Sequence, residues 1–144
     1  MKKQVDPRMH SAEHILNQTM VRRYDCGRCF TAHIERKKSK CDYHFDHALT
    51  GDETHEIQSL VNRVIKSDLP VSKTFVLKKE AQRLYDTGKL PEDVDGRVRI
   101  IHVGTYDACP CIGDHVTSTR EIGTFRITTT SFKDGVLRIR FKLS

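Results

Sequence analysis

The sequence contains no tryptophan and no apolar run that approaches the ~20 residues of a membrane-spanning helix. The lysines at the N-terminus are not followed by an apolar stretch, and this pattern argues against a secretory signal. The phenylalanines and tyrosines are scattered, with no base-stacking RNP motif among them. We therefore expect a cytoplasmic protein that does not contact a membrane, and we expect no nucleotide cofactor.

Internal repeats, low-complexity segments and linkers are also absent. A chain of 144 residues is long enough for one hydrophobic core, and 37% hydrophobic with 31% charged residues is a composition typical of globular proteins. The sequence therefore predicts a single domain that spans residues 1–144.

Cysteine is present in an odd number, five residues, which argues against a disulfide framework in a chain without an export signal. Eight histidines accompany the cysteines, and Cys and His at suitable spacings point to bound metal. The formal net charge of +6 leaves two interpretations open, a basic surface that aids solubility or a polyanionic partner such as RNA.

Local patterns predict an α+β domain. A helix is expected over about 7–24, where Asp6 caps the start and Pro7 suits the first helical position. Thr50 and Glu53 form a capping box before a second helix with apolar residues at helical spacing. The other expected elements are strands at 30–36, 41–47, 71–77 and 97–103, a short helix at 79–87 stopped by Gly88, and a closing hairpin of strands 125–130 and 136–141. This order favours a largely antiparallel sheet with packed helices.

Two pairs of metal-binding residue types stand near opposite ends of the chain. His10 and His14 are four residues apart on the first expected helix, so they share one face and can reach one ion. Cys111 and His115 form the second pair, and Gly113 between them allows a tight backbone turn. One cysteine and three histidines make a suitable tetrahedral shell for Zn²⁺. The sequence therefore predicts a zinc site between an early helix and a late loop.

Two other zinc arrangements fit parts of the sequence. The first is a zinc-finger-like set formed by Cys26, Cys29, Cys41 and His44. A separation of three residues on a strand places Cys41 and His44 on opposite faces, which argues against this set. The second is the H-x-x-E-H motif of inverted zinc peptidases, matched by His10, Glu13 and His14. Such a peptidase would take a carboxylate as its third ligand, whereas this short chain offers a Cys/His pair.

The two pairs together resemble the editing domain of alanyl-tRNA synthetase, its free-standing AlaX-type relatives and the second additional domain of threonyl-tRNA synthetase. Those proteins carry an early H-x-x-x-H helix and a late C-x-x-x-H pair, and all four residues bind zinc. The matching positions here are His10, His14, Cys111 and His115. Residues 33–39, 42–46, 61–65 and 115–123 are similar to further family segments in the same order, so the resemblance covers nearly the whole chain.

The resemblance implies a zinc-dependent aminoacyl-tRNA deacylase that acts in trans on mischarged tRNA, with serine or glycine on alanine tRNA as the expected substrate. Its partner would be the aminoacylated 3′ end of tRNA. A shell of four protein ligands favours a positioning or structural role for zinc over a metal-bound hydroxide. Glu13 and Asp114 flank the ligands, and either is a candidate to orient the attacking water or to support a ligand.

Three further residues are candidates for contact with the substrate. Ser11 could meet the side chain of the amino acid, and the resemblance implies that His33 and Arg36 lie near the aminoacyl pocket. The sequence departs from the family there, because Arg36 replaces a common glutamine, Lys38 replaces a glycine, and residues 112–114 replace Gly-Gly-Thr. These departures keep open a non-catalytic zinc-binding module of the same fold that binds RNA or protein, although we favour the enzyme.

Basic residues gather at the end of the first expected helix and in the hairpin that follows. They are Arg22, Arg23, Arg28, Arg36, Lys37, Lys38 and Lys40. If these two elements pack side by side, the residues form one basic patch near the zinc site that could hold the phosphates of the tRNA acceptor end. The alternative is a lysine-rich turn that serves solubility alone.

Overall fold

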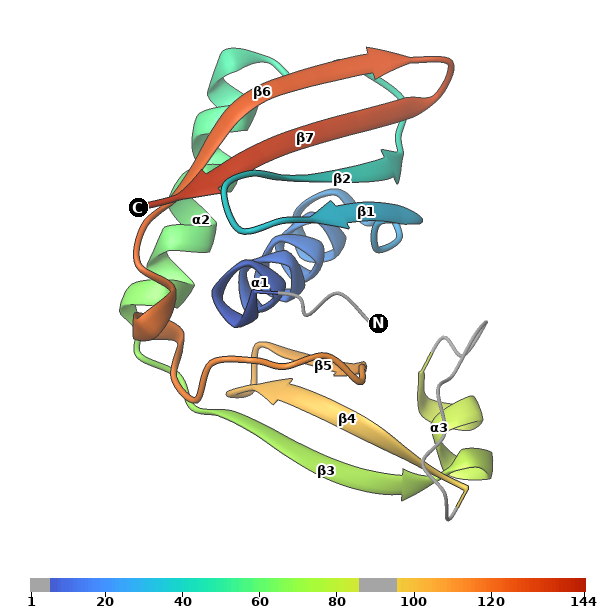
Figure 1. The fold of residues 1–144 in the computed structure, drawn as a ribbon. Coiled ribbons are helices and arrows are strands. Elements are labelled where there is room, and N and C mark those ends of the chain that lie inside the picture. The colour runs from blue at the N-terminus through green and yellow to red at the C-terminus, as the bar shows by residue number, and fades with distance from the viewer. Residues whose placement is uncertain (1–5, 86–95) are drawn as a thin grey trace.

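The computed structural model describes residues 6–85 and 96–144. Helix α1 leads into a β-hairpin, and the second helix α2 connects this hairpin to the remaining strands (Figure 1). The elements are α1 (Pro7–Tyr24), β1 (Thr31–Ile34), β2 (Ser39–His44), α2 (Gly51–Lys66), β3 (Val71–Leu77), α3 (Lys78–Leu84), β4 (Arg97–Val103), β5 (Asp107–Pro110), the 3₁₀ helix η1 (Thr119–Ile122), β6 (Phe125–Lys133) and β7 (Val136–Leu143).

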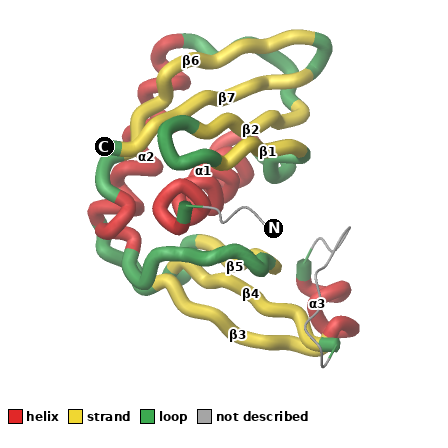
Figure 2. Tube along the Cα trace, in the orientation of Figure 1, coloured by secondary structure: helices red, strands yellow, loops and turns green. Residues whose placement is uncertain are grey.

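The strands form two antiparallel sheets on either side of α1. One sheet has the order β1-β2-β7-β6 and the other the order β3-β4-β5, and every strand pair within them is antiparallel. Figures 1 and 2 show α1 between the two sheets, with α2 beside it against β6 and β7. The predicted α+β class with antiparallel pairing is confirmed, and the structure divides the strands between two sheets.

Helix α1 begins where the sequence predicts, because the Asp6 carboxylate accepts hydrogen bonds from the backbone N–H groups of Arg8 at 2.9 Å and Met9 at 3.3 Å. Half of its 18 residues are buried, including polar ones such as Ser11 and His14. A helix covered on two sides buries more than one apolar stripe, so α1 can carry polar functional groups inside the protein.

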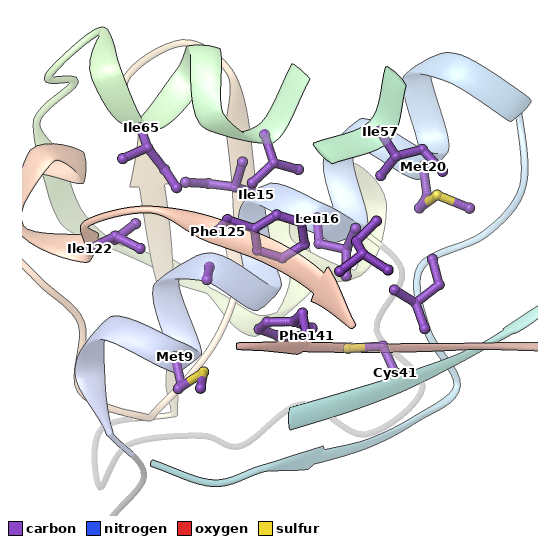
Figure 3. Close-up of a cluster of buried hydrophobic side chains, with 14 of the residues drawn as sticks. Met9, Ile15, Leu16, Met20, Cys41, Ile57, Ile65, Ile122, Phe125 and Phe141 are labelled. Atoms are coloured by element: carbon purple, nitrogen blue, oxygen red, sulfur yellow. The ribbon is translucent and has the colours of Figure 1, made fainter. Parts of the chain in front are cut away.

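The main hydrophobic core lies where α1 and α2 meet the inner face of the four-stranded sheet. Leu16 of α1 and Ile57 of α2 surround Phe125 and Phe141, whose rings lie 5.0 Å apart at their centroids (Figure 3). Each of these four side chains is fully buried. Alternate residues of β6 and β7 supply this face, which is the period-2 pattern of a sheet with one side covered.

The other helices follow their sequence signals closely. Thr50 and Glu53 form the predicted capping box of α2, since the Thr50 hydroxyl accepts from the Glu53 N–H and the Glu53 carboxylate accepts from the Thr50 N–H. Helix α3 ends at Leu84, and the predicted stop at Gly88 falls outside the described residues. Over residues 6–85 and 96–144, no helix combines the length and the apolar character needed to cross a membrane.

The strand bounds differ from the sequence prediction at several places. The second strand begins at Ser39 rather than at residue 41, because Ser39 and Lys40 pair with Phe141 and Arg140 of β7. Strand β5 and helix η1 were not predicted. Residues 107–110 contain a cysteine and a proline and have no alternating pattern, so their strand depends on pairing with β4 at the edge of the small sheet.

Replacement of a leucine in the main core should cost far more stability than the same replacement on the surface. We expect Leu16→Ala to lower the free energy of unfolding by ~2–5 kcal/mol, because it leaves a cavity among α1, α2 and the sheet. The matched control Leu84→Ala changes a side chain that is 56% exposed and should stay within ~0.5 kcal/mol of the parent. Urea denaturation measures both, and equal losses would contradict the assignment of this core.

Candidate metal centre

The four residues predicted to bind metal come together in the structure. Helix α1 presents His10 and His14 on successive turns, and the loop after β5 presents Cys111 and His115. One ligand atom from each residue lies within 4.8 Å of the ligand atoms of the other three. This group of one thiol and three imidazoles could bind a metal ion, as the two sequence pairs predicted.

The distances within the group fit a tetrahedral ion. The Cys111 Sγ atom lies 3.3 Å from His10 Nε2 and 3.4 Å from His115 Nε2. A tetrahedron with Zn–S near ~2.3 Å and Zn–N near ~2.0–2.1 Å has sulfur–nitrogen edges of about 3.5 Å. The ring of His14 completes the group, with its centroid 5.1 Å from that of His10 and 4.5 Å from that of His115.

The electrostatics of Cys111 and His115 favour the protonation states that bind metal, whereas the pKa of His14 is raised, so His14 would have to release a proton when a cation binds. Burial raises the pKa of the Cys111 thiol, but hydrogen bonds with the three histidine rings outweigh burial and lower this pKa to about 3. Burial lowers the pKa of His115 and keeps its imidazole neutral near pH 7. A thiolate beside neutral imidazoles is the form in which these residues coordinate a cation.

The outer nitrogen of each histidine ring faces an oxygen atom. Ser11 Oγ lies 2.9 Å from His115 Nδ1, and the carbonyl oxygen of Asp114 lies 3.3 Å from His10 Nδ1. The third contact, between His14 Nδ1 and Asp107 Oδ2, is 3.6 Å long, and His14 Nδ1 is buried without a hydrogen-bond partner in the described part of the chain. Metal-bound histidines characteristically donate their other N–H to such an oxygen, so this surrounding layer fits a metal centre.

Asp107 is a site residue that the sequence did not reveal. Its carboxylate accepts hydrogen bonds from Arg28 Nη1 at 2.8 Å and from Gln18 Nε2 at 2.9 Å, and it also faces His14. Burial lowers the pKa of His14, whereas contacts with Asp107 and Cys111 raise it to about 9. A carboxylate behind a ligating histidine could be expected in general, but no local signal singles out residue 107.

Arg99 is a second such residue, and it fixes the loop that carries Cys111. Its guanidinium donates to the carbonyl oxygen of Cys111 at 2.7 Å and to that of Gly113 at 2.6 Å. Gly113 does not adopt a positive φ, so the tight turn expected there is not what requires a glycine. The reason is close approach, because a Cβ atom at position 113 would overlap the ring of His10.

The two predicted catalytic carboxylates occupy different surroundings. Glu13 lies at the edge of the metal-binding group, with Oε1 3.7 Å from His10 Nε2 and Oε2 3.7 Å from Cys29 Sγ. Asp114 is exposed and touches the group through its backbone oxygen rather than its carboxylate. Of the two, Glu13 has the side chain closer to the ligands.

The three residues predicted to contact substrate are divided between the metal centre, where Ser11 lies, and the β1–β2 hairpin, which carries His33 and Arg36. Ser11 is fully buried, and its hydroxyl bonds His115 and the N–H of Val116, so it orients a ligand instead of facing a substrate. His33 points away from α1, into a hollow on the opposite face of the sheet. Arg36 lies in the exposed turn between β1 and β2.

The zinc-finger-like alternative is wrong as a set of four. Cys41 is buried whereas His44 is exposed, stacked on Phe30 at 4.1 Å between centroids, as expected from their spacing on a strand. The Cys26 thiol contacts the carbonyl oxygen of Met20. Glu13, Cys29 and Cys41 do form a second compact group of possible metal-binding type, directly beside the first.

The predicted basic patch is also divided. Ser39 Oγ contacts Met9 Sδ at 3.3 Å, which places the hairpin turn with Lys37 and Lys38 beside the first turn of α1. Arg22 and Arg23 lie in the last turn of α1, where Arg22 donates to the Tyr106 carbonyl and Arg23 pairs with Glu56. Arg28 donates to the Asp107 carboxylate. The prediction of one patch fails because the hairpin packs against the start of α1 and not its end.

Comparison with known proteins agrees with this arrangement. Residues 98–140 match the threonyl and alanyl tRNA synthetase second additional domain. The chain is 32% identical over 146 residues to an alanine–tRNA ligase of Methanopyrus kandleri, covering 93% of this chain and 15% of that protein. It is 34% identical over 146 residues to an alanine–tRNA ligase of Caldivirga maquilingensis, covering 93% of this chain and 16% of that protein. It is 29% identical over 135 residues to one of Borrelia garinii, covering 92% of this chain and 23% of that protein. The chain thus spans less than a quarter of the length of these relatives.

The matched region includes β4, β5 and the loop with Cys111 and His115, so the class of the protein follows from fold, site and sequence together. Part of the chain, residues 98–140, matches the second additional domain of threonyl- and alanyl-tRNA synthetases. The chain is thus an editing-domain-like protein related to alanyl-tRNA synthetase, which confirms the resemblance seen in the sequence.

A methyl group at position 113 should weaken metal binding. In Gly113→Ala the new Cβ displaces the His10 ring from Cys111, so we expect the affinity for Zn²⁺ to fall by at least ~10-fold. The matched control is Gly51→Ala, where a Cβ would meet nothing within 4 Å. Competition with a chromophoric chelator measures both affinities. Equal affinities in the two variants would show that His10 does not need this close approach.

Proposed function

We propose that this protein is a zinc-dependent aminoacyl-tRNA deacylase that acts in trans on mischarged tRNA in the cytoplasm. The observation that carries the proposal is the convergence of His10, His14, Cys111 and His115 in a protein related to alanyl-tRNA synthetase. The expected substrate is alanine tRNA that carries serine or glycine. In this proposal, residues 1–144 act as one second additional domain.

Zinc is the metal that this donor set favours. One thiolate with three imidazoles suits a borderline-soft ion of tetrahedral preference, whereas Mg²⁺ and Ca²⁺ take oxygen ligands. Zinc bound there would supply positive charge that positions the aminoacyl group of the substrate. Four protein ligands fill the tetrahedral shell, so the remaining chemistry falls to side chains at its edge.

Glu13 is the side chain best placed for that chemistry. In the hydrolysis, a water oxygen adds to the ester carbonyl, the bond from this carbon to the ribose oxygen breaks, and the ribose oxygen receives the proton that water gives up. The Glu13 carboxylate borders the ligands on the side of His10 and can accept and return this proton. Ser11 and Asp107 hold two of the histidine rings in place during the reaction.

A non-catalytic zinc module that binds RNA or protein is the alternative function. Two observations favour it. Arg36 and Lys38, which depart from the residues common in the family, are exposed in the hairpin turn, and Ser11, a candidate substrate contact, is buried. A protein of this kind would bind tRNA without releasing the amino acid.

Purified protein should contain about one zinc ion per chain, because four ligands make one closed shell. Cys111→Ala should lose the metal and lower Tm, since metal binding contributes to folding stability. Cys26→Ala is the matched control and should keep the metal. Asp107→Asn should retain the fold and bind zinc ~10–100-fold more weakly. Elemental analysis measures the zinc content of each variant. Zinc that is retained in Cys111→Ala but lost in Cys41→Ala would assign the metal to the second group, formed by Glu13, Cys29 and Cys41.

Alanine tRNA charged with serine or glycine should lose its amino acid when incubated with the protein, faster than in buffer alone. Glu13→Gln should slow this release by ~10²–10⁴-fold with unchanged zinc content, because it removes the proton acceptor. Glu80→Gln, which changes an exposed carboxylate of α3, is the control and should keep the parent rate. Binding of charged tRNA without release would instead establish the non-catalytic module.

A further inference from the structure

The outer face of the four-stranded sheet, on the side away from α1, is lined by basic residues. Cys41 of β2 and Ile139 of β7 are paired and face the core. The neighbouring register position pairs His33, Lys40 and Arg140, whose side chains point to the outer face. Further outward positions on this face are Arg138 and Lys142 of β7 and Arg126 of β6, and Lys38, directly before β2, adds to them. The strand register, and not the local sequence, collects these residues on one side.

Positive charge on this face is largely uncompensated. The cationic side chains of Lys38, Lys40, Arg126, Arg138, Arg140 and Lys142 face it together with the carboxylates of Asp42 and Glu35, in a protein of formal net charge +6. Asp42 is fully engaged by Arg138, which donates to both carboxylate oxygens at 2.8 and 2.9 Å. Within residues 6–85 and 96–144, Lys40 and Lys142 make no ion pair. Like charges at this density favour a bound polyanion.

A hollow of about 320 Å³ lies in this face, at its end near the β1–β2 turn. Lys38, Lys40, Arg140 and Lys142 line it together with one carboxylate, that of Glu35, and His33, Ser39 and Thr128 add further polar groups. Among the described residues, the Arg140 guanidinium donates one hydrogen bond, to the Thr129 hydroxyl at 3.5 Å, so it can still bind two anionic oxygens. A concave surface with an excess of positive charge focuses the field, and phosphate groups are the anions that arginine and lysine bind best.

The hollow and the metal centre lie at the same end of α1. Ser39 borders the hollow and contacts Met9, and the next residue of the helix is the ligand His10. A sheet–helix layer spacing of ~10 Å and a helix diameter of ~10–12 Å put the two places on the order of 20 Å apart. A few nucleotides of single strand can cross this distance around the β1–β2 turn.

We propose that this outer sheet face, centred on the hollow, binds the sugar-phosphate backbone of tRNA next to its acceptor end. The identification of the RNA as tRNA rests on the proposed function, while the phosphate chemistry of the surface stands on its own residues. Of the patch predicted from sequence, Lys38 and Lys40 belong to this surface. The cationic residues that share this surface with them are Arg126, Arg140 and Lys142 from the other end of the chain, and not the arginines of α1.

RNA fits this surface better than a lipid membrane does. Interfacial membrane binding combines basic residues with apolar side chains that enter the lipid. The lining of the hollow is polar or charged throughout. The exposed ring of Phe30 stacks on His44, at the opposite end of β2 from the hollow, and the exposed Phe75 and Leu77 belong to β3 of the other sheet. A rigid face with paired strands and fixed cation spacing suits an ordered phosphate backbone.

The test compares two triple variants that remove the same charge. One carries Lys40→Gln, Arg140→Gln and Lys142→Gln on the sheet face, and the other carries Lys66→Gln, Lys73→Gln and Lys79→Gln elsewhere. Binding of an uncharged alanine-tRNA acceptor minihelix is measured by fluorescence anisotropy across a KCl series. The sheet-face variant should bind at least ~10-fold more weakly, with a salt slope reduced by about 2–3, one unit per lost phosphate contact. The second variant should stay within about 2-fold of the parent.

Equal losses in the two variants would overturn the proposal, because net charge alone would then explain binding. Binding of the parent to phosphatidylserine vesicles, abolished by the sheet-face changes while minihelix binding persists, would overturn it in favour of a membrane.

The serine-charged minihelix separates this proposal from the enzymatic one. A raised KM with unchanged kcat in the sheet-face variant supports both. If the parent protein releases no amino acid but the sheet-face variant selectively loses RNA binding, the result supports the RNA-binding surface and refutes the deacylase. If the sheet-face variant releases the amino acid with an unchanged KM, the result supports the deacylase and refutes the RNA-binding surface.

Discussion

The convergence of a thiolate and three imidazoles between α1 and the loop after β5 is the constraint on which the functional part of the structure depends. Without a cation, the Cys111 thiolate would be a partly buried negative charge held only by hydrogen bonds from the rings around it. A metal ion bound there would remove this conflict and would tie the first helix to a segment about a hundred residues later. The same tie fixes the small sheet against α1, since β5 leads directly into the ligand loop.

Around this centre, buried charge is organised so that each group supports the next. Arg28 and Gln18 hold Asp107, Asp107 faces His14, and Arg99 holds the backbone of the ligand loop. Truncation of a buried partner of this kind leaves an uncompensated charge, which costs more than an exposed ion pair contributes. The site is therefore rigid because of polar contacts across the interface between α1 and the small sheet, while the apolar core on the other side of α1 supplies the bulk of the stability.

Helix α1 thus separates two working surfaces. On the side of the small sheet it presents ligands to the metal centre, and on the other side it supports a sheet whose outer face carries uncompensated cations. The proposed ester hydrolysis and the proposed RNA binding make different demands, because the first needs a few fixed groups and the second a broad field. In the proposed mechanism these two demands are met on opposite sides of α1.

The sequence by itself determined the starts of α1 and α2, the α+β class and the four residues of the candidate metal centre, because caps and His-x-x-x-His spacing act within one or two turns of the chain. It could not reveal the roles of Asp107 and Arg99, whose partners are distant in sequence, or the true reason for Gly113, which is the approach of His10. It also joined Lys38 to the arginines of α1, although strand register unites that lysine with Arg140 and Lys142. Local interactions decide where elements begin, whereas only packing decides which of their faces meet.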